Sequence, residues 1–491
     1  MHSRFKGLSH DVLIYGLGSA LSRLISVFTA PILTWYFVPA DYGAMALTQT
    51  VISCFILMLS FNLHSGIFRY FYEYETDSER SVVVSTGFLF YFVAGFVLGL
   101  IVWLSADLVE GLLTISSSGQ SLPYPYAYYF QIMAYGVPST LLNTHFMSVF
   151  RLRRMAWAYA AVNACQVVLN VGFVLFAVVV LKYGIDGVLF SGVLTSLIIT
   201  LLALAILYRF YTFTFSFQIL GSILSYCLPQ FPAVVMNWSL AQSNRFFINY
   251  FSTLEHQGYY AIALKLASLL LLFVTAFRLA WDPFAMAQMK TENAKEFYAR
   301  GYEFYSLLFV FIGASIALLS KPVLILLTPD TYWVAHSIVI FLIMAFVYQG
   351  ANNILGIGIS ISKKTKFISY AQVSSLVVNI SLNFILVPKY GAWGAAIAFL
   401  CGTIAQSISV YLFSQKVYEV DYKFFKIQVL NVLVFIYVVA FVYSVGDLDI
   451  LYIIPCSLLS IIVLAVLILK LFVLDEDRLL LLSKMPWRRT D

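Results

Sequence analysis

Four basic residues stand inside long apolar stretches of the sequence, where a charge is costly. They are Arg23, Arg245, Lys265 and Arg278. A cation in the middle of a bilayer costs about 3 kcal/mol on insertion scales, so it requires a wet cavity or a partner. Every Asp and Glu falls in a connecting segment, a tail or the last turn of an apolar stretch. Unbalanced cations of this kind favour binding of an anion such as a phosphate.

The helical neighbours of three of these cations are small or polar, as the lining of a cavity requires. They are Gly16, Ser19, Ala20, Ser26, Ala30 and Thr34 for Arg23; Ala261, Ser268 and Thr275 for Lys265; and Trp238, Ala241, Gln242 and Asn249 for Arg245. We therefore predict that Arg23, Lys265 and Arg245 contact substrate. Trp238, Gln242, Asn249 and Arg278 are secondary candidates.

The alternative for Arg245 and Arg278 is snorkelling, in which the charged end reaches the membrane surface. Arg278 stands one turn before Asp282, which favours an i,i+4 pair at the inner interface. The five cysteines are scattered singly, without metal-ligand or disulfide spacing. We predict no catalytic residue, no metal site and no cofactor.

The composition identifies the surroundings of these charges. The chain has 491 residues, of which 62% are hydrophobic and 11% are charged, and its mean hydropathy is +0.90. Soluble proteins are about a quarter charged. This balance excludes a soluble enzyme, a nucleic-acid-binding protein and a disordered chain, and it predicts an all-α integral membrane protein.

Fourteen apolar segments are long enough to cross a membrane as helices. They are 11–37, 41–66, 82–106, 124–149, 156–181, 185–208, 219–249, 257–283, 301–320, 333–358, 366–387, 391–415, 424–444 and 449–473. With the N-terminus inside, 22 of the 29 Lys and Arg residues lie on the inner side and three lie on the outer side. Because basic residues are retained in the cytoplasm, this bias supports fourteen spans with both termini cytoplasmic.

Two pairs of similar segments indicate an internal duplication. The segment 36–47 resembles 250–261, with Gly43 and Gly258 215 residues apart, and the segment 182–187 resembles 389–394. We interpret the repeated glycines as turn and close-packing positions. Six helices per repeat predict two parallel lobes around a central cationic cavity, an arrangement found in transporters. The expected boundaries are 1–212 and 213–420, with two extra helices in 421–491.

Two further features concern motion and energy coupling. Pro229 and Pro232 are expected to kink the helix that carries Arg245. His145 is interpreted as a packing residue, and a role in proton coupling is the alternative.

These residues resemble a known family. Gly18, Arg23, Pro31, Pro39 and 41–43, followed by 67–71, are similar to the opening of polysaccharide flippases of the multidrug/oligosaccharidyl-lipid/polysaccharide exporter (MOP) superfamily. Arg245 with 246–248, the segment 280–284, and Asn383 with 388–391 are similar to second-half motifs of the same family. His64 and Asn244 depart from it, because many relatives are expected to have an acid at both positions.

The resemblance implies two six-helix lobes and the translocation of undecaprenyl-diphosphate-linked oligosaccharides across the inner membrane by alternating access. The products expected are O-antigen, capsule or exopolysaccharide. The expected partners are the lipid-linked oligosaccharide, membrane lipids and a glycan polymerase with its chain-length machinery. A peptidoglycan-precursor flippase has the same anchor and stays an alternative. A multidrug cation antiporter and a membrane glycan polymerase are weaker alternatives, since cavity carboxylates and a large outer loop are missing from the sequence.

Overall fold

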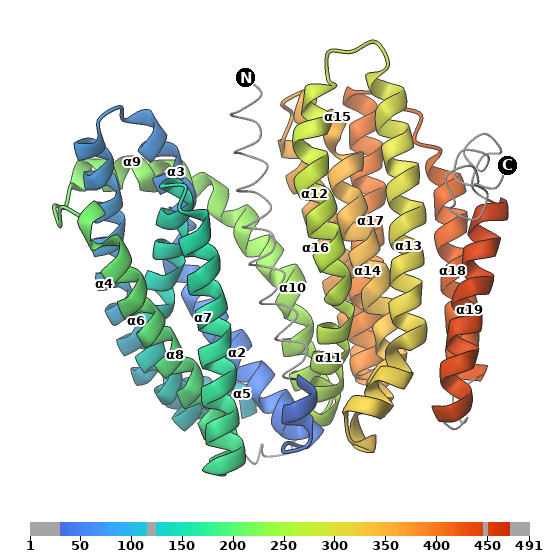
Figure 1. The fold of residues 1–491 in the computed structure, drawn as a ribbon, viewed down its shortest axis with the longest axis horizontal. Helices are drawn as coiled ribbons and strands as arrows, with labels where there is room; N and C mark the ends of the chain where they lie inside the picture. Colours follow the sequence, from blue (N-terminus) through green and yellow to red (C-terminus); the bar gives the residue numbers. More distant parts are fainter. Residues whose placement is uncertain (1–29, 115–123, 445–449, 472–491) are drawn as a thin grey trace, which may run out of the picture. The chain divides into compact units, whose positions relative to one another are not determined.

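The computed structural model describes residues 30–114, 124–444 and 450–471 and is 89% helical. No strand occurs in these ranges. The chain divides into two compact units (Figure 1). Unit 1 comprises residues 1–262 and 376–398, and unit 2 comprises residues 263–375 and 399–491. The units are described one at a time, and the lobe boundaries expected from the repeat stay a prediction.

Unit 1 contains the first helices of the described chain. Their bounds are α2 Pro39–Ser60, α3 Leu63–Glu73, α4 Asp77–Leu104, α5 Ala106–Thr114, α6 Tyr126–Leu152, α7 Ala156–Leu175 with the π-helical turn η1 Phe176–Val180, α8 Gly184–Leu207, η2 Tyr208–Phe210, α9 Phe217–Cys227, η3 Leu228–Gln230 and α10 Phe231–Phe251. The core of this part lies where α6 packs between α4 and α8.

Three helices cross from one unit to the other, and the rest belong to unit 2. The crossing helices are α11 Leu254–Ala267, α16 Lys366–Tyr390 and α17 Ala392–Val417. Unit 2 contains α12 Leu269–Ala287, α13 Ala294–Leu327, η4 Asp330–Ala335, α14 His336–Leu355, α15 Ile357–Ile361, α18 Phe424–Ser444 and α19 Ile450–Leu471. Its core is built on α13, which packs against α14, α18 and α19.

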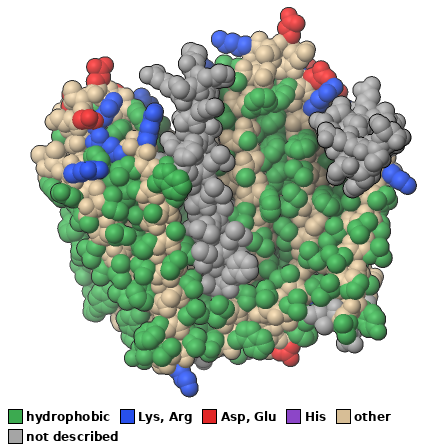
Figure 2. All heavy atoms as spheres, viewed as in Figure 1, with side chains coloured by type: hydrophobic (Ala, Val, Ile, Leu, Met, Phe, Trp, Pro, Cys, Tyr) green, Lys and Arg blue, Asp and Glu red, His purple; other side chains and the backbone are tan. Residues whose placement is uncertain are grey.

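Twelve helical segments in the described ranges are long and apolar enough to cross a membrane. α6 has 27 residues and is also long enough to span, although its many tyrosines and its polar residues lower its hydropathy. The predicted first span, 11–37, lies mostly outside the described residues. The predicted all-α membrane fold is confirmed. Figure 2 shows hydrophobic side chains along the sides of the helices and charged side chains gathered near the helix ends.

Two of the predicted spans are bent. The predicted segment 41–66 consists of α2 and α3, which are separated because Phe61 and Asn62 adopt left-handed backbone conformations. The predicted segment 219–249 consists of α9 and α10, with the 3₁₀ turn η3 between them, where Pro229 and Pro232 were expected to interrupt the helix.

The repeated glycines have equivalent conformations. Gly184 has φ +62° and Gly391 has φ +53°, a region open to glycine at little cost. Three residues later, a side chain on Gly187 would press on Ala177, and one on Gly394 would overlap the carbonyl of Leu386. Both glycines of each motif therefore serve the turn and close-packing roles expected from the sequence.

The start of α2 is held from two sides. Asp41 in its first turn accepts a hydrogen bond from the backbone N–H of Val38 at 3.2 Å. The Tyr124 hydroxyl donates to the other oxygen of Asp41 at 2.7 Å. Burial and the neighbouring carboxylate raise the pKa of Tyr124, so this phenol stays protonated and remains a donor.

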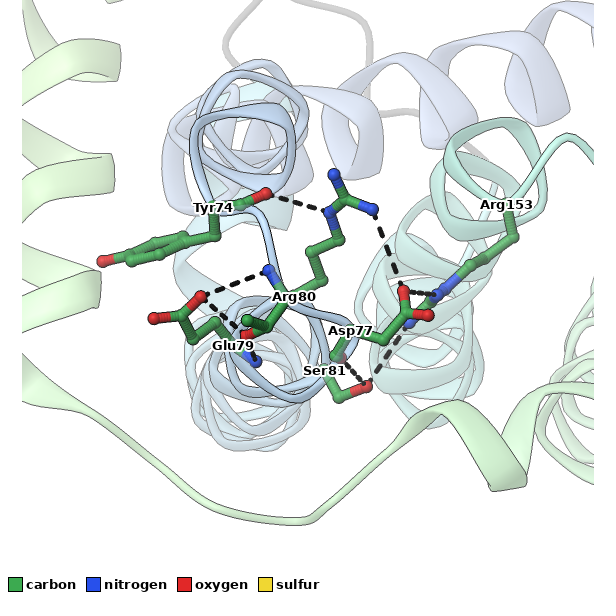
Figure 3. A network of polar contacts seen from close by, with 7 residues as sticks. Tyr74, Asp77, Glu79, Arg80, Ser81 and Arg153 are labelled. Atoms are coloured by element: carbon green, nitrogen blue, oxygen red, sulfur yellow. Dashed lines mark hydrogen bonds and ion pairs between the residues drawn. The ribbon is translucent and has the colours of Figure 1, made fainter.

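The start of α4 shows how the basic residues at the helix ends are held (Figure 3). Arg80 donates to the carbonyl of Tyr74 at 3.0 Å. Arg153, from the end of α6, contacts Asp77 at 3.1 Å and Ser81 at 3.3 Å. These contacts join α4 to the end of α6.

Candidate substrate site

One helix, α10, carries four of the predicted site residues. Trp238, Gln242, Arg245 and Asn249 follow each other at intervals of four, three and four residues, which places them on one face. Trp238, Gln242 and Arg245 are half-buried and Asn249 is buried. The face predicted from the sequence is therefore continuous in the structure.

Two side-chain hydrogen bonds join this face to α2. Arg245 Nη1 donates to Thr50 Oγ1 at 2.8 Å, and Trp238 Nε1 donates to Ser53 Oγ at 3.1 Å. The Thr50 and Ser53 hydroxyls donate their own protons to the carbonyls of Ala46 and Thr50. Both oxygens are therefore oriented as acceptors toward α10. We call these two contacts the polar rungs.

The rungs leave polar atoms of the face unpaired. In the described part of the chain, Arg245 Nε, Gln242 Oε1 and Asn249 Oδ1 are buried without a hydrogen-bond partner. The ion pairs found there involve other cations, so Arg245 has no carboxylate within 4.0 Å. The face thus holds an uncompensated positive charge, one spare donor and two spare acceptors. A phosphate with attached hydroxyl groups has the complementary chemistry.

A buried amide cluster lies on another side of α10. Asn244 Oδ1 accepts from Asn379 Nδ2 at 3.1 Å and from Asn383 Nδ2 at 2.8 Å, and Asn244 Nδ2 donates to the Tyr260 hydroxyl at 3.0 Å. Ser243 Oγ donates to Asn379 Oδ1 at 3.2 Å. We call Asn244, Asn379 and Asn383 the asparagine cluster. It ties α10 to α11 and α16 and fixes the rotation of α10 about its axis.

Sequence reasoning did not assign this cluster to the site. Asn383 entered only as a family motif, Asn244 only as a departure from one, and Asn379 not at all. The available signal was the i,i+4 spacing of Asn379 and Asn383 inside an apolar span. Buried amides at that spacing require partners from another helix.

The other predicted cations belong to segments other than α10. Lys265 is half-buried on α11, and Arg278 is exposed on α12, where its charge acts on Asp282 one turn later. Both belong to unit 2, whereas the α10 face belongs to unit 1. Arg23 lies outside the described residues. Their assignment to the site stays a prediction.

His145 lies inside an aromatic cluster. It is fully buried, and its ring is within 6.4 Å of the rings of Phe88, Tyr91, Phe146 and Tyr211. Neither ring nitrogen has a hydrogen-bond partner in the described ranges. This environment is that of a packing residue. No group of three or more His, Cys, Asp or Glu side chains suited to a metal ion occurs among the residues described.

Comparison with known proteins adds a family and a fold. Residues 32–337 match the model of a family described as polysaccharide biosynthesis protein. Protein 1 of the Lsg locus of Haemophilus influenzae is 25% identical over 292 residues, which are 58% of this chain and 67% of that protein.

Two solved structures share the fold. The lipid II flippase MurJ, in an inward closed conformation, has a TM-score of 0.73 and 15% identity, and the match covers 93% of this chain and 99% of MurJ. A multidrug resistance transporter of the MATE family of the MOP superfamily, in an inward-facing conformation, has a TM-score of 0.64 and 16% identity. That match covers 81% of this chain and 97% of the transporter.

Proposed function

This chain belongs to the polysaccharide biosynthesis protein family, and on that premise we propose that it is a flippase for undecaprenyl-diphosphate-linked oligosaccharides. It moves the oligosaccharide units across the inner membrane by alternating access, with both termini cytoplasmic, for O-antigen, capsule or exopolysaccharide assembly. A glycan polymerase with its chain-length machinery receives the product.

The observation that carries this proposal is the uncompensated charge of Arg245 beside unpaired polar atoms. A guanidinium matches phosphate oxygens in charge and geometry. One close pair contributes about 4 kcal/mol at an effective dielectric near 20. The diphosphate lies against Arg245, while Gln242 and Asn249 bind sugar hydroxyls and Trp238 packs on a sugar ring.

Arg23 and Lys265 complete the cationic set in this proposal, and Arg278 contributes from the inner end. The polyprenyl chain stays in the surrounding lipid. An inside-negative potential favours outward movement of the anionic headgroup by ~2.3 kcal/mol per full charge per 100 mV.

The test is display of surface glycan by a deletion strain that expresses variants. Arg23→Ala and Arg245→Ala are expected to abolish display while the protein accumulates normally in the membrane, and Arg23→Lys is expected to be milder. Arg300→Ala is the matched control, because Arg300 is exposed and paired with Glu296 on α13. Full display with the Arg23 and Arg245 variants would refute the assignment.

A peptidoglycan-precursor flippase is the second candidate, favoured by the likeness of the fold to the lipid II flippase MurJ. The deletion strain separates the two functions. Accumulation of a lipid-linked surface glycan on the inner leaflet supports the first proposal. Accumulation of the peptidoglycan precursor supports the second.

A further inference from the structure

The two copies of the repeated motif contact each other through their glycines. α2 begins at Pro39 and has Gly43 as its fifth residue, and α11 begins at Leu254 and has Gly258 as its fifth residue. A Cβ atom on Gly43 would overlap the carbonyl oxygen of Leu254. A Cβ atom on Gly258 would overlap the carbonyl oxygen of Pro39. The contact is reciprocal, because each glycine meets the first residue of the other helix.

Such reciprocity is the mark of a two-fold relation between the two helices. Each glycine directs a Cα hydrogen at a carbonyl of the other helix. Only glycine permits this contact, because the Cβ of any other residue would overlap the carbonyl oxygen. The parallel repeat predicts an axis along the membrane normal. We expect a reciprocal contact between equivalent positions to lie on that predicted axis, across one end of the transport path.

A neighbouring amide indicates that the contact is made to open. Gln257 is fully buried, and its Cβ lies 3.0 Å from the position of a Cβ on Gly43. Within the described ranges neither amide atom of Gln257 has a hydrogen-bond partner. A contact that never opens would not require a buried amide without hydrogen bonds. Asn244 is equally buried, and both of its amide atoms are hydrogen-bonded. Separation of α2 and α11 would let water hydrate Gln257.

We propose that the reciprocal contact of Gly43 and Gly258 is a reversible seal across one end of the transport path, and that burial of the unpaired Gln257 amide favours its opening. The inference rests on the proposed function, because a seal requires a path. The polar rungs join α2 to α10 through Thr50 and Ser53, so α2 contacts both α10 and α11.

The first experiment measures access to position 257 while the glycines are intact. Gln257→Cys is introduced after replacement of the five native cysteines, and a membrane-impermeant maleimide is applied to intact cells and to inside-out vesicles. We expect Cys labelling to rise severalfold in cells that synthesise the lipid-linked glycan, compared with cells that do not. The preparation that labels identifies the sealed end. If the Gln257→Cys variant exports glycan while position 257 stays unlabelled, the proposal of a reversible seal is wrong.

The second experiment breaks the contact. Gly43→Ala and Gly258→Ala are expected to make position 257 label rapidly with or without substrate, and to abolish glycan display. Gly192→Ala and Gly172→Ala are matched controls, because a Cβ at either position meets no atom within 4 Å. Protection of position 257 in a Gly43→Ala protein that accumulates normally would overturn the seal. If the deletion strain displays glycan without the protein, the proposed function fails instead.

Discussion

Thr50 illustrates how single residues prepare the site. Its hydroxyl proton is donated to Ala46, so its oxygen presents lone pairs to Arg245 from the facing helix. The guanidinium is thereby held with one nitrogen paired and Nε unpaired. A half-buried cation that is held but not neutralised keeps its charge available for an anion.

Removal of this acceptor tests the first polar rung. Thr50→Val keeps the shape of the side chain and leaves Arg245 Nη1 without its partner. Hydrogen bonds to charged groups contribute about 1.5–3 kcal/mol, so we expect a loss of that order in the free energy of unfolding. Thermal unfolding of the purified protein in detergent measures it, with Thr50→Ser as the control that retains the hydroxyl. A Thr50→Val protein as stable as the parent would contradict the rung.

The asparagine cluster makes a second prediction at this scale. Asn244→Leu removes the acceptor shared by Asn379 and Asn383; the Asn379 amide N–H loses its partner, whereas Asn383 Nδ2 still donates to Asn379. We expect destabilisation of about 1–3 kcal/mol for each group left unsatisfied. Gln218→Leu, at an exposed position of α9, is the control and should change stability little. Equal unfolding temperatures for the two variants would show that the cluster does not hold α10.

At the scale of elements, α10 presents the candidate substrate site on one side and is anchored to its neighbours on another. One face carries Arg245 and its polar neighbours, and another carries Asn244 in its cluster. The helix begins after η3 and runs in a different direction from α9 (Figure 1). The break therefore decides how the substrate face is presented to α2.

Removal of the prolines tests the break. In the double variant Pro229→Ala/Pro232→Ala, alanine supplies the backbone N–H groups that proline lacks. A proline in a helix interior is about 3 kcal/mol less favourable than alanine. We expect slower amide hydrogen exchange across residues 226–233 and reduced glycan display, because a continuous helix turns Trp238 and Arg245 away from the rungs. Pro455→Ala in α19 is the control. Unchanged exchange would mean that the prolines do not cause the break.

At the scale of the molecule, the chain is a multi-pass membrane protein whose fold is similar to those of MurJ and a MATE-family transporter. The chain belongs to the family described as polysaccharide biosynthesis protein. Most basic residues fall in alternate connecting segments. That distribution predicts which connecting segments face the cytoplasm, and this orientation can be measured without any substrate.

Reporter fusions test this orientation. Alkaline phosphatase, which is active only outside the cytoplasm, should be active when fused after Lys182 or Lys389 and inactive when fused after Arg154 or Lys426. The physical reason is retention of clustered Lys and Arg in the cytoplasm. The opposite pattern would invert the predicted topology.

The amino-acid sequence alone determined the membrane environment, the all-α class and the face of α10 that holds Arg245, whereas the fourteen spans and the duplication stay predictions. These properties depend on composition and on spacing along one helix, and both can be counted in a single chain. Only the tertiary structure decided that Thr50 faces Arg245, that Asn379 and Asn383 meet Asn244, and that Gly43 meets Leu254. Helical periodicity shows which side of a helix a residue occupies, whereas the identity of the facing helix depends on packing between segments far apart in the sequence, as Gly43 and Leu254 are.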